Sequence, residues 1–174
     1  MRETGGHDDR FAFGGGCHWC TEAVFQHVEG VREVRQGFAA SIAPHEASSE
    51  AAWVVFDPRS LTLERLVEIH LATHASASAH SMRGKYRSAV YARGDDALAL
   101  AREALVAAAT ALNTVPVTRA LPFVSFTPSD PRYQDYYRSD PDRPFCRVHI
   151  EPKLARLKAL PFAGAGDGTS ACDG

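Results

Sequence analysis

Hydrophobic and polar residues alternate in three short stretches of the first third of the chain. This alternation predicts β-strands over Arg10–Phe13, Val31–Phe38 and Ala52–Phe56, because successive side chains of a strand point to opposite faces of a sheet. Between the first two strands, apolar residues recur at helical spacing over residues 23–28, and Gly30 ends that helix. The order of these elements predicts a fold in which strands and helices share one core.

Two longer stretches carry apolar residues at the spacing of an α-helix that packs one face against a core. One helix is predicted to be capped near Ser60 and to reach Leu71, and a second is predicted over Asp95–Leu112. Both are expected to cover the sheet. The residues expected to face the core are Leu63, Leu66, Val67, His70 and Leu71 in the first helix, and Leu98, Ala101, Leu105, Ala108 and Leu112 in the second.

The segments beside these helices give shorter signals. Residues 87–92 are expected to form a strand, whereas residues 74–85 lack a clear period and are expected to form a long loop. Residues 115–120 and 123–127 suggest another strand or a hairpin, which Pro122 interrupts. The strands are thus interleaved with the helices along the whole chain.

The C-terminal part of the chain is less regular. Beyond Pro128 it is rich in turn residues up to residues 146–150, and a short helix is predicted from Pro152 to about Leu160. With 174 residues, of which 45% are hydrophobic, the chain can bury one sizeable core. We therefore expect a single catalytic domain over residues 1–160 and a flexible tail over residues 161–174.

Charge and hydropathy exclude several classes of partner. The chain has 19 basic and 21 acidic side chains, a net charge of −2 and no basic run, so we expect no nucleic-acid partner. No stretch approaches the roughly 20 apolar residues that a membrane span needs. The first nine residues are polar and do not resemble a signal peptide. We expect a cytoplasmic monomer without a membrane partner.

The run from Gly14 to Cys20, Gly-Gly-Gly-Cys-His-Trp-Cys, lies where a predicted strand gives way to a helix. Cys17 is therefore expected near a helix N-terminus, where unpaired N–H groups and the helix dipole stabilise a thiolate. The alternative is a glycine-rich turn with a buried, inert thiol. The second thiol three residues on favours a nucleophile. Four cysteines without an export signal indicate redox chemistry or metal binding rather than structural disulfides.

Several separated motifs between residues 10 and 160 resemble those of one family, the type A peptide methionine sulfoxide reductases. The block Gly16–Cys20 is similar to the family's Gly-Cys-Phe-Trp-Cys signature, and Glu50 occupies the place of its catalytic glutamate. The Gln-Tyr-Arg-Ser, His-Gln-Asp-Tyr and Pro-Tyr-Cys blocks of the family are matched by Tyr86–Tyr91, Tyr133–Tyr137 and Pro144–Cys146. The resemblance implies an α+β fold, a ferredoxin-like α/β sandwich with a mixed sheet and an irregular C-terminal segment.

The same resemblance implies thiol-dependent reduction of methionine S-sulfoxide, free or in proteins, in the repair of oxidative damage. Cys17 is then the nucleophile that becomes a sulfenic acid, and Glu50 donates a proton to the departing oxygen. Tyr86 and Tyr136 are implied hydrogen-bond donors, and Trp19 is the implied wall for the substrate methyl group. Neither a cofactor nor a metal is implied.

A second thiol must convert the sulfenic acid to a disulfide, and three candidates remain open. Cys20 lies one helical turn from Cys17, Cys146 holds the family's resolving position, and Cys172 lies on the predicted tail. The resemblance implies that thioredoxin or a similar dithiol reductant then reduces the final disulfide.

The chain departs from the family's pattern at several positions. His18 stands where phenylalanine is usual, which removes part of an apolar wall and adds an ionisable ring. Phe38 and Phe145 replace tyrosines, Ser81 replaces an aspartate, and Lys85 replaces a glutamine. We expect a working but divergent enzyme in which His18 and Phe38 still line the substrate site.

Two other classes compete with a reductase of methionine sulfoxide. A general dithiol-disulfide oxidoreductase would use Cys17 and Cys20 alone, as thioredoxin uses its pair. A non-catalytic sulfoxide-binding or metal-binding module would use the same thiols with His18. A second ligand pair at zinc spacing is missing from the sequence, which disfavours the metal-binding alternative.

Overall fold

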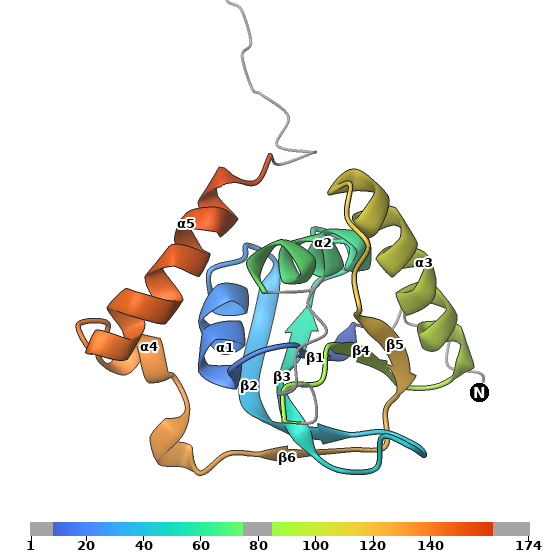
Figure 1. Cartoon of the computed structure of the whole chain (residues 1–174), viewed down its shortest axis with the longest axis horizontal. Helices are drawn as coiled ribbons and strands as arrows, with labels where there is room; N and C mark the ends of the chain where they lie inside the picture. The colour runs from blue at the N-terminus through green and yellow to red at the C-terminus, as the bar shows by residue number, and fades with distance from the viewer. Residues whose placement is uncertain (1–8, 75–84, 162–174) are drawn as a thin grey trace, which may run out of the picture.

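A single mixed β-sheet forms the centre of the computed structural model, which describes residues 9–74 and 85–161 (Figure 1). Its strands are β1 (Arg10–Gly14), β2 (Val31–Ala40), β3 (Ser49–Phe56), β4 (Ala89–Ala92), β5 (Arg119–Pro122) and β6 (Ser125–Pro128). Their spatial order is β5-β4-β1-β3-β2-β6. Strands β4 and β5 pair in parallel, and every other neighbouring pair is antiparallel.

Helices cover one face of this sheet. They are α1 (His18–Gln26), α2 (Leu63–Thr73), α3 (Asp95–Ala111), α4 (Tyr136–Ser139) and α5 (Glu151–Ala159). Figure 1 shows α1, α2 and α3 on the same side of the sheet, and α5 packs against both α1 and α2. A π-helical turn, Cys146–Ile150, leads directly into α5. The C-terminal helix therefore reaches back to the helix that begins next to Cys17.

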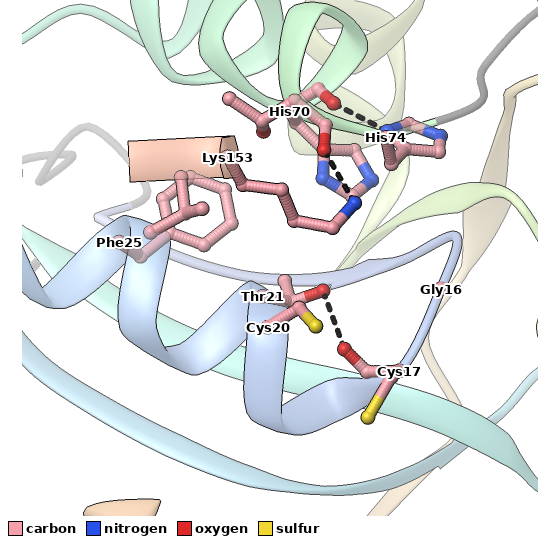
Figure 2. Close-up of a pocket in the computed structure, with 10 residues that line it drawn as sticks. Gly16, Cys17, Cys20, Thr21, Phe25, His70, His74 and Lys153 are labelled. Atoms are coloured by element: carbon pink, nitrogen blue, oxygen red, sulfur yellow. Dashed lines mark hydrogen bonds between the residues drawn. The ribbon is translucent and has the colours of Figure 1, made fainter. Parts of the chain in front are cut away.

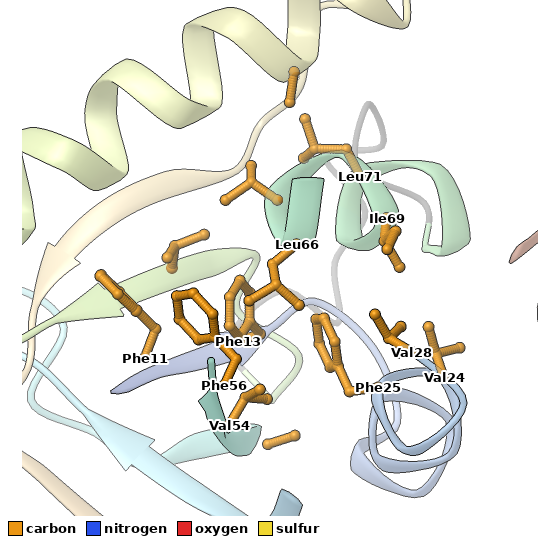
Figure 3. Packing of buried hydrophobic residues seen from close by; sticks show 14 of the residues in the cluster. Phe11, Phe13, Val24, Phe25, Val28, Val54, Phe56, Leu66, Ile69 and Leu71 are labelled. Carbon is orange, nitrogen blue, oxygen red and sulfur yellow. The ribbon is translucent and has the colours of Figure 1, made fainter. Parts of the chain in front are cut away.

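The main hydrophobic core lies between the helices and the sheet (Figure 3). Phe11 and Phe13 of β1 both point into it, as the alternation of a strand requires. The ring of Phe13 lies 4.7 Å from that of Phe25 in α1 and 5.3 Å from that of His70 in α2, measured between centroids. These rings tie β1, α1 and α2 together, and so they hold the loop between β1 and α1.

A smaller cluster packs on the opposite face of the sheet. Tyr91 of β4 is fully buried there, beside Trp53 of β3. The rings of Phe123 and Phe126 cover Trp53, with centroids 5.1 and 6.0 Å from it. The sheet therefore has two apolar faces, and the helices of residues 9–74 and 85–161 cover one of them.

Replacing Phe25 by alanine is expected to lower the free energy of unfolding by about 3 to 5 kcal/mol, because the substitution leaves a cavity among rings that cannot collapse to fill it. The Phe25 side chain is fully buried against Phe13 and His70. Urea unfolding of the full chain measures the change. Val106→Ala is the control, since Val106 is 69% exposed on α3 and its truncation is expected to cost less than about 0.5 kcal/mol.

The observed architecture confirms the predicted α+β class and its mixed sheet. The predicted helix cap near Ser60 is displaced by two residues, because Ser60 closes the turn that follows β3, where its N–H donates to the Asp57 carbonyl at 3.1 Å. Thr62 is the actual N-cap of α2, and its hydroxyl accepts a hydrogen bond from the Arg65 N–H at 3.2 Å.

The hairpin considered for residues 115–127 is wrong. Strand β5 pairs with β4 at one edge of the sheet, whereas β6 pairs with β2 at the other edge. The chain passes from one edge of the sheet to the other at two consecutive residues. The Phe123 N–H donates to the Ala92 carbonyl of β4 at 2.8 Å, and the Val124 N–H donates to the Ala40 carbonyl of β2 at 3.1 Å. Pro122 ends β5 rather than interrupting a longer strand.

Two expectations fall largely outside the described part of the chain. The predicted tail begins at residue 161, which is the last residue described, and the predicted loop over residues 74–85 is described only at its two ends. Within residues 9–74 and 85–161, none of the helices combines the length and the apolar character that crossing a bilayer requires.

Candidate active site

Cys17 lies at the N-cap of α1, directly after the glycine loop that leaves β1. Its carbonyl accepts hydrogen bonds from the N–H groups of Cys20 at 3.1 Å and Thr21 at 3.2 Å, which start the helix. The Cys17 side chain is half-buried. The predicted position at a helix N-terminus is therefore confirmed.

The glycine loop passes close to two histidines of α2 and its C-terminus. The ring Nε2 of His70 lies 2.8 Å from the Gly14 carbonyl, to which it donates. A Cβ atom at Gly15 would lie only 2.5 Å from the His74 ring, so any side chain there would collide with it. The close approach of backbone and ring explains why this segment needs glycine.

Cys17 and Cys20 influence each other's protonation. The pKa of Cys17 is lowered, chiefly by a hydrogen bond from the Cys20 thiol and further by the backbone N–H groups of Trp19 and Cys20, against the opposing effect of burial. The pKa of Cys20 is raised, because its thiol proton is held in that hydrogen bond and because the side chain is buried. Of the two side chains, Cys17 is therefore the one that ionises more readily.

A small cavity of about 10 Å³ lies behind this pair, large enough for about one water molecule. Figure 2 shows Lys153 of α5 reaching into it between α1 and α2, where its ammonium donates to the Thr73 carbonyl at 2.7 Å. Burial lowers the pKa of Lys153, and the nearby Cys20 and Cys17 oppose that shift. A cationic group therefore lies on the inner side of the two thiols.

Glu50 approaches the N-terminus of α1 from the start of β3, and it is 8% exposed. Its Oε2 accepts a hydrogen bond from the His18 backbone N–H at 3.0 Å, one residue after Cys17. The Lys85 ammonium lies 3.7 Å from Oε1 of the same carboxylate. The sheet register therefore brings Glu50 to the helix end that carries Cys17.

Trp19 forms an aromatic wall with two residues from the C-terminal part of the chain. Its ring stacks on Tyr136 of α4 with centroids 4.1 Å apart and planes 3° apart, and Phe145 meets it edge-on at 5.5 Å. The indole Nε1 is buried and has no hydrogen-bond partner among the described residues. The wall is therefore mostly apolar, as a site for a methyl group requires.

Glu22 fixes the position of the segment that supplies Tyr136. Its buried carboxylate accepts hydrogen bonds from the backbone N–H groups of Asp135 and Tyr136, both at 3.0 Å. Asp135 has a φ of 55°, so these contacts hold a left-handed backbone conformation. Burial raises the pKa of Glu22 to about 7, although both N–H donors favour its charged form.

The free energy of unfolding is expected to fall by roughly 2 to 3 kcal/mol because of Glu22 as the pH rises from about 4.5 to about 7. The folded chain binds this proton more tightly than the unfolded chain. The stability that the protonated Glu22 contributes is therefore fully present below the pKa of the unfolded chain. It is lost as the pH rises through the folded pKa of about 7.

Urea unfolding across this pH range, on the unchanged chain and on Glu22→Gln, measures the effect. The glutamine variant is expected to lack this fall, because its side chain cannot ionise. Glu29→Gln serves as the control, since Glu29 is exposed shortly after the same helix and its loss should leave the fall in place. If the free energy of unfolding fell equally with pH in the unchanged chain and in Glu22→Gln, the fall would not come from Glu22.

The remaining predicted residues lie at different distances from this centre. His18 and Phe38 meet edge-on at 5.2 Å, next to Glu50. Tyr86 is half-buried and lies under the Lys85 ammonium, 5.0 Å from ring centroid to Nζ. Cys146 is completely buried in the core cluster that also contains Cys20. Ser81 and Cys172 fall outside the described residues.

Sequence reasoning missed four residues that the fold brings to the site: Glu22, His70, His74 and Lys153. His70 was recognised only as a core-facing residue. A polar side chain on an otherwise apolar helix face is the signal that could have identified it, because buried polar groups need partners. No comparable signal marks Lys153, whose contact depends on how α5 docks.

No group of three or more His, Cys, Asp or Glu side chains within residues 9–74 and 85–161 is arranged to hold a metal ion. The described site instead combines a cysteine with a lowered pKa, a neighbouring thiol, a carboxyl group and an aromatic wall. These features define a thiol-based oxidoreductase on an α+β fold.

Comparison with known proteins is more specific. The family model described as "Peptide methionine sulfoxide reductase" matches residues 9–163. The chain therefore belongs to the type A peptide methionine sulfoxide reductase family, as the sequence motifs predicted.

Two individual proteins that the chain resembles are members of the same family. Peptide methionine sulfoxide reductase MsrA of Thermus thermophilus is 32% identical over 159 residues, which cover 83% of this chain and 90% of that protein. Methionine sulfoxide reductase A of Corynebacterium diphtheriae is similar in structure, with a TM-score of 0.64 at 25% identity over 78% of this chain and 77% of that one.

A third similarity concerns the fold alone. Mxr1 from Saccharomyces cerevisiae in complex with Trx2 has a TM-score of 0.56 at 18% identity, covering 70% of this chain and 80% of that one.

Proposed function

We propose that this chain reduces methionine S-sulfoxide, free or in proteins, to methionine and thereby repairs oxidative damage. The observation that carries the proposal is the Cys17 thiol at the N-terminus of α1, activated by Cys20 and flanked by a buried carboxyl group. Membership of the family supports the substrate class.

In the first step, the Cys17 thiolate attacks the sulfoxide sulfur while Glu50, acting as general acid, delivers a proton to the oxygen. The sulfur–oxygen bond of the sulfoxide breaks and the oxygen passes to Cys17. Methionine leaves with two electrons gained, and Cys17 becomes a sulfenic acid. Tyr86 is the proposed additional hydrogen-bond donor to the oxygen, from its position beside Lys85.

The substrate side chain is proposed to lie against the aromatic wall. Trp19 offers a polarizable ring for the methyl group, and its stacking on Tyr136 keeps that ring in one orientation. The proposed site extends to His18 and Phe38, whose rings lie edge-on to each other beside Glu50.

Cys20 is the proposed first resolving thiol. Its thiol lowers the pKa of Cys17 as a hydrogen-bond donor, so the two side chains interact across one turn of α1. Condensation of the Cys17 sulfenic acid with the Cys20 thiol forms a sulfur–sulfur bond and releases water. Cys146 would take over that disulfide by exchange, since it lies in the same core cluster as Cys20. Thioredoxin or a similar dithiol would then reduce the enzyme, which is consistent with the complex that Mxr1 forms with Trx2.

The test is to mix the fully reduced chain with a peptide that contains methionine S-sulfoxide, without added reductant. At least one methionine per chain is expected, with thiols lost in pairs. No methionine, with every thiol retained, would overturn the proposed function. Cys20→Ser is expected to produce methionine and to leave a sulfenic acid that a dimedone-type reagent captures in larger amounts than on the unchanged chain.

A general dithiol-disulfide oxidoreductase is the second candidate function, because Cys17 and Cys20 lie one helical turn apart and Cys20 lowers the pKa of Cys17. Such an enzyme would reduce insulin disulfides and would not depend on Glu50. Insulin reduction by the unchanged chain and by Glu50→Gln separates the two functions.

We also propose the ferredoxin-like description for the core of a single domain over residues 1–160. The supporting observation is the element order β1-α1-β2-β3-α2-β4 with the spatial order β4-β1-β3-β2.

A monomer in the cytoplasm is proposed as well, since the described cysteines are free thiols, as in a reducing compartment. Light scattering of the purified chain and fractionation of cells test these two points.

A further inference from the structure

The segment that carries Tyr136 is fastened to the rest of the chain at two neighbouring points. The first is Gln134, whose side-chain Oε1 accepts from the Gln36 N–H of β2 at 3.1 Å and whose Nε2 donates to the Gln36 carbonyl at 2.8 Å. The second is Glu22 of α1, whose two carboxylate oxygens each accept one backbone N–H, from Asp135 and from Tyr136, at 3.0 Å. The amide contact carries no charge, whereas the carboxylate can take up a proton.

The aromatic wall of the site depends on the same segment. The Tyr136 ring stacks on Trp19 with centroids 4.1 Å apart, and Phe145 meets the two rings edge-on. The N–H that donates to Oε1 of Glu22 belongs to the residue whose ring covers Trp19. A shift of this backbone therefore moves one ring of the wall directly.

Glu22 holds this backbone more firmly when it is ionised. The side chain is fully buried, and burial raises its pKa to about 7 against the effect of the two N–H donors. In the ionised form, the negative charge strengthens both hydrogen bonds. A proton on one oxygen turns that oxygen into part of a donor group, so the N–H that faces it is held less firmly.

We propose that Glu22 is a positioning residue for substrate binding: its ionised carboxylate holds Tyr136 against Trp19, and uptake of one proton loosens the wall that receives the methyl group. The inference rests on the proposed function, which places the substrate methyl group on Trp19. The affinity for the sulfoxide should therefore fall as the pH decreases through about 7. The contribution of Glu22 to stability changes in the opposite direction, because it reports the cost of burying the charge rather than the contacts of the wall.

Charged side chains affect Glu22 less than these two backbone groups do. Asp135 raises the pKa of Glu22 and Arg138 of α4 lowers it, and these two side chains also approach each other at 3.7 Å. Glu22 takes part in none of the ion pairs among residues 9–74 and 85–161. On the other elements that contact α1, the ionisable side chains that are buried or half-buried are Tyr136, Tyr137, Glu50, Cys146 and Lys153.

The first test measures the concentration of a peptide methionine S-sulfoxide that gives the half-maximal single-turnover rate of the reduced chain. For the unchanged chain, this concentration should be roughly fivefold higher at about pH 6 than at about pH 8, the effect of one weakened hydrogen bond. Glu22→Gln keeps one acceptor oxygen and cannot ionise, so it should need the higher concentration at both pH values. Its maximal rate should stay within roughly twofold of that of the unchanged chain at each pH. An equal rise in both chains would overturn the proposal.

Two control variants should keep the rise between pH 8 and pH 6. Glu29→Gln removes an exposed carboxylate shortly after the same helix. Gln134→Met removes the uncharged contact with Gln36 and leaves Glu22 in place, so it should weaken affinity at both pH values without removing the rise. Loss of the rise in either variant would overturn the assignment to Glu22.

A second readout does not depend on activity. Trp53→Phe leaves Trp19 as the only tryptophan of the chain, and the fluorescence of Trp19 reports whether Tyr136 stays stacked on it. The emission should change with a midpoint near pH 7, and the change should disappear when Glu22→Gln is added. A transition that persists in that double variant would come from another group, such as His18 beside Trp19, and would overturn the proposal.

The absence of any transition in Trp53→Phe would also overturn the proposal, and this measurement needs no substitution of Glu22. If the unchanged chain makes no methionine, the proposed function fails. The fluorescence of Trp19 then still decides whether the charge of Glu22 holds Tyr136 in place.

Discussion

Replacement of Cys17 by serine is expected to abolish methionine formation, with a rate at least roughly a thousandfold below that of the unchanged chain. Serine keeps the size of the side chain and the N-cap geometry. However, a hydroxyl is not ionised near neutral pH and cannot accept the oxygen in a form that a thiol reduces. The hydrogen bond from Cys20 and the N–H groups of α1 would then have no thiolate to stabilise.

The measurement is methionine released per chain from a peptide sulfoxide, without added reductant. Cys146→Ser provides the matched comparison, because it replaces sulfur by oxygen at a different cysteine. This variant should still release one methionine per chain. Circular dichroism and urea unfolding serve to check that both variants fold. If Cys17→Ser formed methionine at nearly the wild-type rate, the nucleophile would have to be another residue.

Glu50→Gln is expected to slow the first turnover by about a hundredfold to ten-thousandfold, the usual contribution of a general acid. The amide oxygen can still accept the hydrogen bond from the His18 N–H, so the strand and helix should stay in register. The amide cannot supply a proton to the departing oxygen. The loss should therefore appear in the rate of methionine formation rather than in substrate affinity.

Single-turnover rates at saturating and at limiting sulfoxide separate these two effects. Glu33→Gln is the control, since Glu33 lies exposed on the neighbouring strand β2, where it pairs with Arg35 on the surface. Its substitution should change the rate by less than roughly twofold. A Glu50→Gln rate equal to that of the control would remove Glu50 from the proposed chemistry.

The local elements of this fold could be predicted from the sequence because each depends on neighbouring residues. Alternation predicted β1, β2 and β3, helical spacing predicted α1, α2 and α3, and the glycine run placed Cys17 at a helix start. The motifs also predicted the family, since short blocks in a fixed order are a property of the chain itself. These conclusions required no knowledge of which strands lie side by side.

The pairing of distant elements was decided only by the tertiary structure. Residues 115–120 and 123–127 gave strand signals, but the assignment of β5 and β6 to opposite edges of the sheet depended on hydrogen bonding to β4 and β2. Likewise, the contact between Glu50 and the His18 backbone joins residues 32 positions apart. The sequence identified both residues, and it did not show that an imidazole nitrogen would face the carboxylate.

The same limit applies to Glu22 and Lys153, which sequence analysis passed over. Glu22 acquires its role from two backbone N–H groups more than a hundred residues later, and Lys153 acquires its role from the docking of α5 against α2. Local periodicity records which face of an element is apolar, and it carries no information on which distant polar group will be buried beside it. The sequence therefore determined the local elements, the position of Cys17 at a helix start and the family, whereas the tertiary structure decided which distant side chains surround Cys17.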